Sequence, residues 1–145
     1  MNITYQEMII NDFDGVYALW KKTPGVGLRS VDDTPEGIGR FLKHNPGTNF
    51  IAKDGDKIIG VILCGTDGRR AYIYHTVVDS DYRGNGIGRK LAELCIDSVK
   101  KLGITRMALV AFKNNEIGNG FWEHIGFVTR EDLLYKNLSL NDKNI

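Results

Sequence analysis

The chain has 145 residues, of which 42% are hydrophobic and 26% are charged, a composition that is typical of globular proteins and excludes a fibrous or disordered chain. This length suits one domain that folds without a metal or a disulfide framework, so we expect a single domain over residues 1–145 with a frayed tail at 139–145. With 19 basic and 18 acidic residues the formal net charge is +1, which provides no general attraction for polyanions, and we expect no nucleic-acid partner.

The N-terminal third predicts one strand and two helices. Residues 3–9 alternate loosely between apolar and polar, as in a strand, and the residues after them carry apolar side chains at helical spacing. The segment TPGVGLRSVDD, at 23–33, has the composition of a loop. Thr34 followed by Pro35 is typical of a helix start, so a second short helix is predicted to end near His44.

Three segments in the middle of the chain predict an antiparallel meander. They are TNFIAK at 48–53, KIIGVILCG at 57–65 and AYIYHTVV at 71–78, all rich in β-branched, aromatic or other apolar residues. Asp-Gly pairs at 54–55 and 67–68 supply the tight turns between them.

The C-terminal half predicts two more helices and up to three strands. Residues 87–101 carry apolar side chains at three- and four-residue spacing, as in an amphipathic helix. The apolar run TRMALVAF, at 105–112, then predicts a strand parallel to the one that precedes the helix. A final helix is expected over 118–124, with closing strands at 127–129 and 133–138. Together these elements indicate an α/β fold of three layers, a mixed and mostly antiparallel sheet covered by about four helices.

Two negative observations restrict the setting of the protein. Cys64 and Cys95 fall in a predicted strand and a predicted helix, without CxxC spacing or a neighbouring histidine, so we expect free buried thiols and no metal site. The N-terminus has no basic segment followed by an apolar run, and no stretch approaches the ~18 apolar residues of a membrane span. We therefore expect no membrane partner and a cytoplasmic location.

A glycine-rich loop, Arg83-Gly84-Asn85-Gly86-Ile87-Gly88, connects the third strand of the meander to the following helix. Unpaired N–H groups and the positive dipole end at the start of a helix attract anions, and glycines let phosphate oxygens approach the backbone. This arrangement predicts a concave site that is suited to a pyrophosphate.

The residues of the loop do not match two other phosphate-binding motifs. A P-loop needs a lysine and a hydroxyl residue after its second glycine, and this loop lacks them. A dinucleotide fingerprint needs a third glycine, but Arg89 or Leu91 stands at that position. The remaining alternative is that the glycines only make a tight strand-to-helix connection.

The loop and a second segment carry a family resemblance. Arg83-x-x-Gly86-x-Gly88 matches the Q/R-x-x-G-x-G/A signature of the GNAT acetyltransferases, and it follows an apolar strand as it does in that family. Asn115 and the later GFWEHIGF resemble the family's N-x-x-A-x-x-F/L-Y-x-x-x-G-F region. The resemblance implies the GNAT fold, in which a β-bulge splays the two parallel strands at the cofactor site. It also implies an acetyl-CoA-dependent N-acetyltransferase.

The resemblance assigns residues to the cofactor, acetyl-CoA. Backbone groups of the strand before the loop would pair with the pantetheine arm, the loop would hold the pyrophosphate, and its two arginines would pair with phosphates. Asn115 would hydrogen-bond the arm, or cap a helix, or both. The residues predicted to line the cofactor site are Thr76, Val77, Val78, Arg83, Gly84, Asn85, Gly86, Ile87, Gly88, Arg89, Asn115 and Trp122.

The catalytic residues are less well defined by the resemblance, because the chain departs from the family pattern. His75 and Tyr74 stand where relatives often carry a carboxylate. We predict His75 as the proton acceptor, or else as a packed strand residue. Tyr74 would orient water or line the acceptor pocket, or else be a half-buried sheet aromatic. Trp122 replaces the family's acid tyrosine and cannot protonate a thiolate, so Tyr135, water or no acid at all takes that role.

The family's oxyanion donor maps to the backbone N–H of Val78. Acceptor recognition is expected from Trp20 and the loop that follows it, including Gly25, Val26, Gly27, Leu28, Arg29, Asp32, Asp33 and Glu36. Asp32 and Asp33 would attract an amine, or are ordinary solvated loop carboxylates.

We predict that the acetyl group goes to a primary amine of a small molecule or an amino-acid-like metabolite, by direct attack in a ternary complex. The alternatives are a protein N-terminal or lysine acetyltransferase and a noncatalytic acyl-CoA sensor. Dimers are common among the proteins that the chain resembles, so the sequence leaves both a monomer and a homodimer as alternatives.

Overall fold

The computed structural model describes all 145 residues and has a central sheet of five strands in the order β1-β2-β3-β4-β5. The first four strands pair antiparallel, whereas β4 and β5 pair parallel. The strands are β1 (Ile3–Glu7), β2 (Phe50–Asp54), β3 (Lys57–Thr66), β4 (Ala71–Val78) and β5 (Met107–Ala108). The predicted meander is confirmed, with the β2–β3 turn at residues 55–56, one position later than expected.

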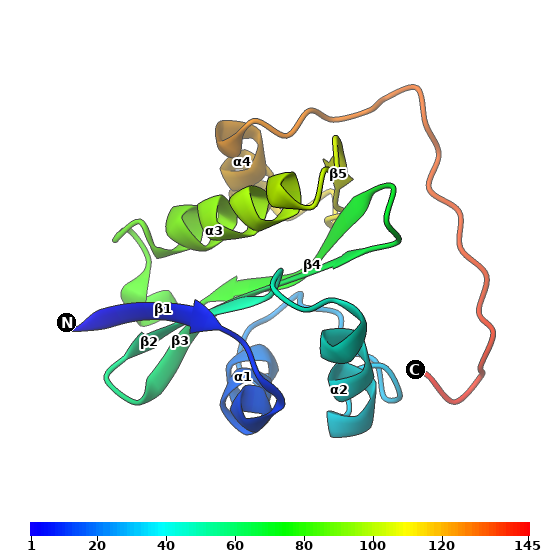
Figure 1. Cartoon of the computed structure of the whole chain (residues 1–145). Coiled ribbons are helices and arrows are strands. Elements are labelled where there is room, and N and C mark those ends of the chain that lie inside the picture. The colour runs from blue at the N-terminus through cyan, green and yellow to red at the C-terminus, as the bar shows by residue number, and fades with distance from the viewer.

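Four helices cover the two faces of this sheet (Figure 1). Helices α1 (Phe13–Lys21) and α2 (Pro35–His44) lie across one face, and α3 (Ile87–Lys101) and α4 (Glu116–Ile125) lie on the other. Short 3-10 turns, η1 (Ile10–Asp12) and η2 (Ser80–Tyr82), precede α1 and the glycine loop. The predicted three-layer architecture is confirmed, because each helix has one apolar stripe to bury against the sheet.

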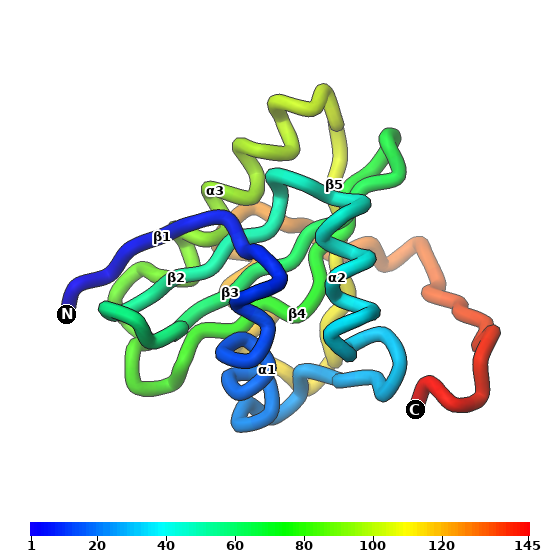
Figure 2. Tube along the Cα trace, turned by 60° about the horizontal axis from the view of Figure 1, so that its bottom comes forward, coloured from blue at the N-terminus to red at the C-terminus, as the bar shows by residue number.

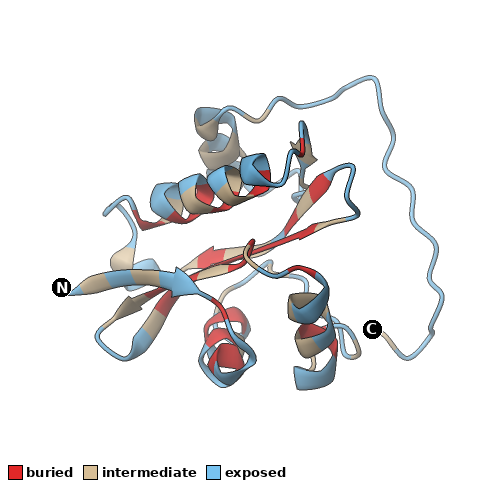
Figure 3. Cartoon of the chain, in the orientation of Figure 1, coloured by how far each residue is buried: buried red, intermediate tan, exposed pale blue.

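Two apolar clusters fill the spaces between these layers, as the buried residues in Figure 3 show. The cluster beneath α3 contains Leu91, Cys95 and Val99 of that helix, at the spacing that the sequence predicts. The cluster beneath α1 contains Trp20 and Val77. Cys64 also lies in the α3 cluster, and both cysteines are free and fully buried, as expected.

The expected strand at 105–112 is much shorter than predicted. Only Met107 and Ala108 pair with β4, while Val110 and Phe112 are exposed. An apolar run favours a strand but provides no partner for its backbone, and here the chain turns away from β4 to begin α4.

The closing strands predicted at 127–129 and 133–138 are absent, because no neighbouring backbone pairs with either segment. This part of the chain runs as an extended, largely exposed segment (Figures 1 and 3). Residues 143–145, part of the tail that is expected to fray, make hydrogen bonds to the loop that precedes α2. Ser30 N–H donates to Ile145 O, Ile145 N–H donates to Ser30 Oγ, Ser30 Oγ donates to Lys143 O, and the Asn144 side chain bonds Val31 and Asp32. Figure 2 shows the C-terminus beside the loop that precedes α2.

Candidate active site

The glycine loop leads from β4 through η2 into the N-terminus of α3. Gly84 and Gly86 have φ angles of 81° and 75°, which side-chain-bearing residues rarely adopt. The first hydrogen bond of α3 runs from Lys90 N–H to Gly86 O. The N–H groups of residues 87–89 therefore have no backbone acceptor and point out of the helix end, as an anion site requires.

Two arginines flank these N–H groups, and both are exposed. Arg83 Nε donates to Val78 O at 3.4 Å, and Arg89 lies 3.7 Å from Glu93, one helical turn away. Neither contact is a bidentate ion pair, so both guanidinium groups remain available to a phosphate.

Asp79 supports the loop and was missed by the sequence reasoning. Its side chain is 1% exposed, accepts from the N–H of Asp81 at 3.0 Å, and accepts at 2.6 Å from Lys22, the residue that follows α1. The Lys22 hydrogen bond, followed by the Asp81 N–H, holds the pKa of Asp79 below its usual range. The Asp-Ser-Asp sequence after the strand is a typical capping signal, which could have identified this residue.

A β-bulge in β4 decides which side chains reach which face of the sheet. The β3–β4 register pairs Val61 with Val77 but Leu63 with Tyr74, so β4 carries one extra residue between Tyr74 and Val77. Ile73 packs in the α3 cluster, whereas Val77, four positions later, packs in the α1 cluster. Regular alternation would put both side chains on one face of the sheet, so the bulge reverses the faces that the side chains reach. It lies in the strand before the glycine loop, where the resemblance predicts a bulge.

Beyond this bulge, one edge of β4 is open, because β5 pairs only with Ala71 and Tyr72. Asp79 N–H donates to Ile59 O across the β3 side. By alternation the backbone of Val77 also faces β3, whereas the backbones of Thr76 and Val78 face the open edge. Two of the three strand residues predicted to pair with the cofactor thus present backbone groups there, and Val77 does not.

His75 lies at the bulge and contacts two residues from the first third of the chain. Its Nε2 is 3.0 Å from Asp33 Oδ1, and its ring lies edge-on to Trp20 with 5.0 Å between ring centroids. The His75 side chain is 16% exposed, and the Asp33 side chain is 5% exposed. Asp33 is therefore not a solvated loop carboxylate, and only the tertiary structure reveals its partner.

Tyr74 lies on the α2 side of the sheet in an aromatic group with Tyr72 and Phe41. Its ring stacks edge-on to Phe41 and at a tilt to Tyr72, with centroid distances of 5.7 and 4.7 Å. Burial, and then the nearby Tyr135, raise the pKa of both Tyr72 and Tyr74, that of Tyr72 to about 12. Both phenols therefore keep their protons at neutral pH and can donate a hydrogen bond but not accept a proton.

The second motif forms the start of α4 and the side of this helix that packs, partly buried, against the α3 cluster. Asn115 caps the helix, since its Oδ1 accepts from Gly118 N–H at 3.0 Å. Trp122 stacks edge-on to Phe121 and Phe127, at 4.9 and 5.3 Å between centroids, and packs against the α3 cluster. The contacts of Trp122 are thus core contacts, and the Oδ1 of Asn115 is engaged by the helix cap.

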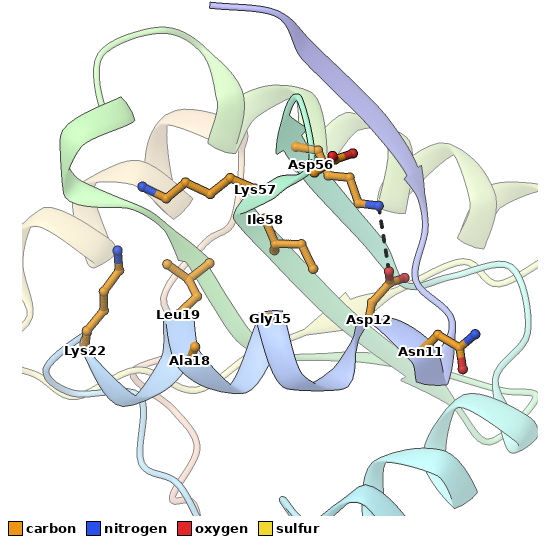
Figure 4. A pocket seen from close by; sticks show the side chains of 10 residues that line it. Asn11, Asp12, Gly15, Ala18, Leu19, Lys22, Asp56, Lys57 and Ile58 are labelled. Atoms are coloured by element: carbon orange, nitrogen blue, oxygen red, sulfur yellow. Dashed lines mark ion pairs between the residues drawn. The ribbon is translucent and has the colours of Figure 1, made fainter.

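A shallow groove of about 470 Å³ lies between α1 and the β2–β3 hairpin (Figure 4). Lys53 lies 4.0 Å from Asp12 inside it, and Lys22 and Lys57 at its end both reach Asp79. Its lysines are thus paired with carboxylates. Nowhere does the chain bring together three potential metal ligands, and none of its helices has the length and apolarity to cross a bilayer.

The chain is similar to known proteins over most of its length. The model of the family described as Acetyltransferase (GNAT) family matches residues 13–127. N-alpha-acetyltransferase 30 of Schizosaccharomyces pombe is 33% identical over 96 residues, which are 62% of this chain and 64% of that protein. An acetyltransferase of Pectobacterium atrosepticum is 29% identical over 119 residues, covering 82% of this chain and 83% of its own. A chain in the crystal structure of the NatC complex bound to Gag peptide and CoA has a TM-score of 0.77 at 26% identity, covering 90% and 87% of the two chains.

Proposed function

The chain belongs to the GNAT acetyltransferase family and is an N-acetyltransferase that uses acetyl-CoA, and from this premise we propose that it acetylates a primary amine of a small molecule or an amino-acid-like metabolite. The observation that carries the proposal is the placement of His75. It lies on β4, directly beside the open strand edge that leads to the glycine loop. One strand thus brings an anion site and a proton acceptor together.

The residues present fit acetyl-CoA. The three free N–H groups at the α3 N-terminus form a cradle for a pyrophosphate, and Arg83 and Arg89 flank it. The backbones of Thr76 and Val78 provide an edge for an extended amide-bearing arm. When bound, acetyl-CoA supplies the acetyl group as an activated thioester.

In the proposed mechanism, His75 accepts the proton that the attacking amine must lose. Positioned general bases typically contribute a factor of ~10²–10⁴ to the rate. The N–H of Val78 faces the open edge and would donate to the carbonyl oxygen as charge develops on it, which is typically worth ~2.7–4 kcal/mol. Both groups belong to the bulged end of β4, so the bulge positions the donor and the base together.

The departing thiolate needs little help from the protein. Trp122 is packed among aromatic rings and cannot supply a proton. A thiol has a pKa of only ~8.5, so its thiolate is a tolerable leaving group. Burial raises the pKa of Tyr74, which precedes His75 on β4, so this phenol retains its proton at neutral pH and is the alternative donor.

A peptide N-terminus is the second candidate acceptor. The fission-yeast relative is named as an N-alpha-acetyltransferase, and the NatC structure contains a peptide together with CoA. An N-terminal amine and an amino-acid-like amine make the same demand on His75. The two acceptor classes differ in what must fit beyond the amine, which the α1–α2 loop would decide.

The test is a calorimetric titration with acetyl-CoA, followed by a thiol-release screen over glycinamide, lysine, spermidine and peptides with a free N-terminus. Saturable binding with turnover of one class supports the proposal and identifies the acceptor. Binding without turnover of any amine favours a noncatalytic acyl-CoA sensor. Absence of binding contradicts the cofactor site itself.

A further inference from the structure

We propose that Asp33 is a positioning residue for His75, which holds the imidazole in the tautomer that leaves Nδ1 free to take the acceptor proton. The inference rests on the proposed function, in which His75 is the base. It concerns a residue that lies outside both family motifs, in the loop between α1 and α2.

Both oxygens of the Asp33 carboxylate are engaged. Oδ1 lies 3.0 Å from His75 Nε2, and Oδ2 accepts from the backbone N–H of Arg29 at 2.7 Å. The Asp33 N–H in turn donates to Arg29 O at 3.2 Å. The carboxylate is therefore held at two points in a site that is almost closed to solvent, which leaves it one orientation.

This contact determines the tautomer of the imidazole. An ionised carboxylate only accepts hydrogen bonds, so Nε2 must carry the hydrogen when His75 is neutral. The lone pair is then on Nδ1. The edge-on contact with Trp20, at an interplanar angle of 72°, limits rotation of the ring. Asp33 therefore selects the atom that can act as base, and Trp20 helps to hold its direction.

The loop that carries Asp33 is itself anchored on both sides. Thr34 Oγ1 donates to Val31 O at 2.9 Å and accepts from Gly37 N–H at 3.0 Å. On the other side, Ser30 Oγ and Ile145 N–H are 3.0 Å apart, which ties the loop to the C-terminal segment. These hydrogen bonds already order the loop before the reaction, so a carboxylate on it can hold an imidazole without a further entropy cost.

The structure makes a sharp prediction for Asp33→Asn, which preserves the shape of the side chain. The N–H of Arg29 still needs an acceptor, so the amide oxygen faces Arg29 and the amide NH₂ faces His75. The NH₂ then donates to Nε2, and the hydrogen moves to Nδ1. The variant keeps both hydrogen bonds and its packing, but it presents His75 in the wrong tautomer.

The experiment measures kcat and the KM for acetyl-CoA with glycinamide, lysine, spermidine and triglycine, in a matched set of variants. Asp33→Asn is expected to lower kcat by about 10²-fold or more, with the KM for acetyl-CoA unchanged. In a His75→Gln background the same change is expected to have no further effect. Asp97→Asn is the control, because it removes the same charge from an exposed side chain on α3, outside the loop that is expected to recognise the acceptor.

Nitrogen-15 NMR of the imidazole tests the tautomer without relying on turnover. The Nε2–H form is expected in the wild-type chain and in Asp97→Asn, and the Nδ1–H form in Asp33→Asn. An unchanged tautomer overturns the proposal. So does an equal loss of kcat with and without His75, since that pattern indicates a purely structural role. If no amine is acetylated, the proposed function loses support, and the NMR comparison still decides whether Asp33 orients His75.

Discussion

The cofactor site can be tested by placing a negative charge in the glycine loop, with Gly86→Asp. Gly86 has a φ angle of 75°, and a Cβ added there meets nothing within 4 Å. The substitution therefore causes backbone strain of about 1–2 kcal/mol but no steric clash. The new carboxylate would lie near the N–H groups that are assigned to the pyrophosphate.

The expected loss of affinity follows from Coulomb's law. Two unit charges about 5 Å apart at an effective dielectric constant of about 20 repel by roughly 3 kcal/mol, which is about a 100-fold change in Kd. Gly86→Asn is the matched control, because asparagine has the same shape, tolerates positive φ and carries no charge. Gly68→Asp adds the same group at another open glycine with φ of 89°, in the β3–β4 loop.

Calorimetric titration with acetyl-CoA, together with thermal unfolding, measures both effects. Gly86→Asp should bind about 100-fold more weakly than Gly86→Asn, and Gly68→Asp should bind like the wild type. If the Asp and Asn variants at position 86 agree within about twofold, the pyrophosphate does not lie at this loop and the assignment is refuted.

Three further predictions concern the supports of the site. In Gly37→Ala the new Cβ would lie 2.2 Å from Asp32 O, so the loop must shift, and kcat should fall with the Kd for acetyl-CoA unchanged; a rise in that Kd with kcat unchanged would contradict this. The lowered pKa of Asp79 means that its stabilising contribution is present above the pKa of an unfolded Asp, ~3.9, and is lost as pH falls through the folded value. Urea midpoints measured from pH 6 to 2 should therefore fall less steeply in Asp79→Asn than in the wild type, and parallel curves would argue against the Lys22 contact. Leu91 is fully buried, so Leu91→Ala should lower the free energy of unfolding by about 2–5 kcal/mol in urea titrations, and a loss below 1 kcal/mol would contradict the packing of α3.

The sequence predicts correctly those features that depend on residues close together in the chain. Thr34 caps α2, and its hydroxyl accepts from the N–H three residues on, as the Thr-Pro pair predicts. The strand at 71–78 has the bounds that its β-branched and aromatic residues indicate. The glycines at 84 and 86 have the positive φ angles that a strand-to-helix loop with an anion cradle needs.

Predictions of pairing failed where the partner is distant in the sequence. The segments 105–112 and 133–138 have strand composition, yet most of the first and all of the second lack a ladder partner. Composition describes what a residue tolerates, whereas a strand exists only if another backbone lies beside it. The hydrogen bonds between residues 143–145 and 30–32 could not be predicted from the sequence either, because the two segments are far apart along the chain.

The sequence by itself determined the order of the four helices and of the first four strands, the glycine-rich loop and the family, because each depends on residues that are neighbours along the chain. Only the tertiary structure decided how His75, the proposed base, is held. Asp33 and His75 are 42 positions apart, and their contact requires both an extra residue in β4 and a loop packed against Gly37. A bulge shifts side chains between faces without leaving a composition signal, so no pattern in the sequence could have paired these two residues.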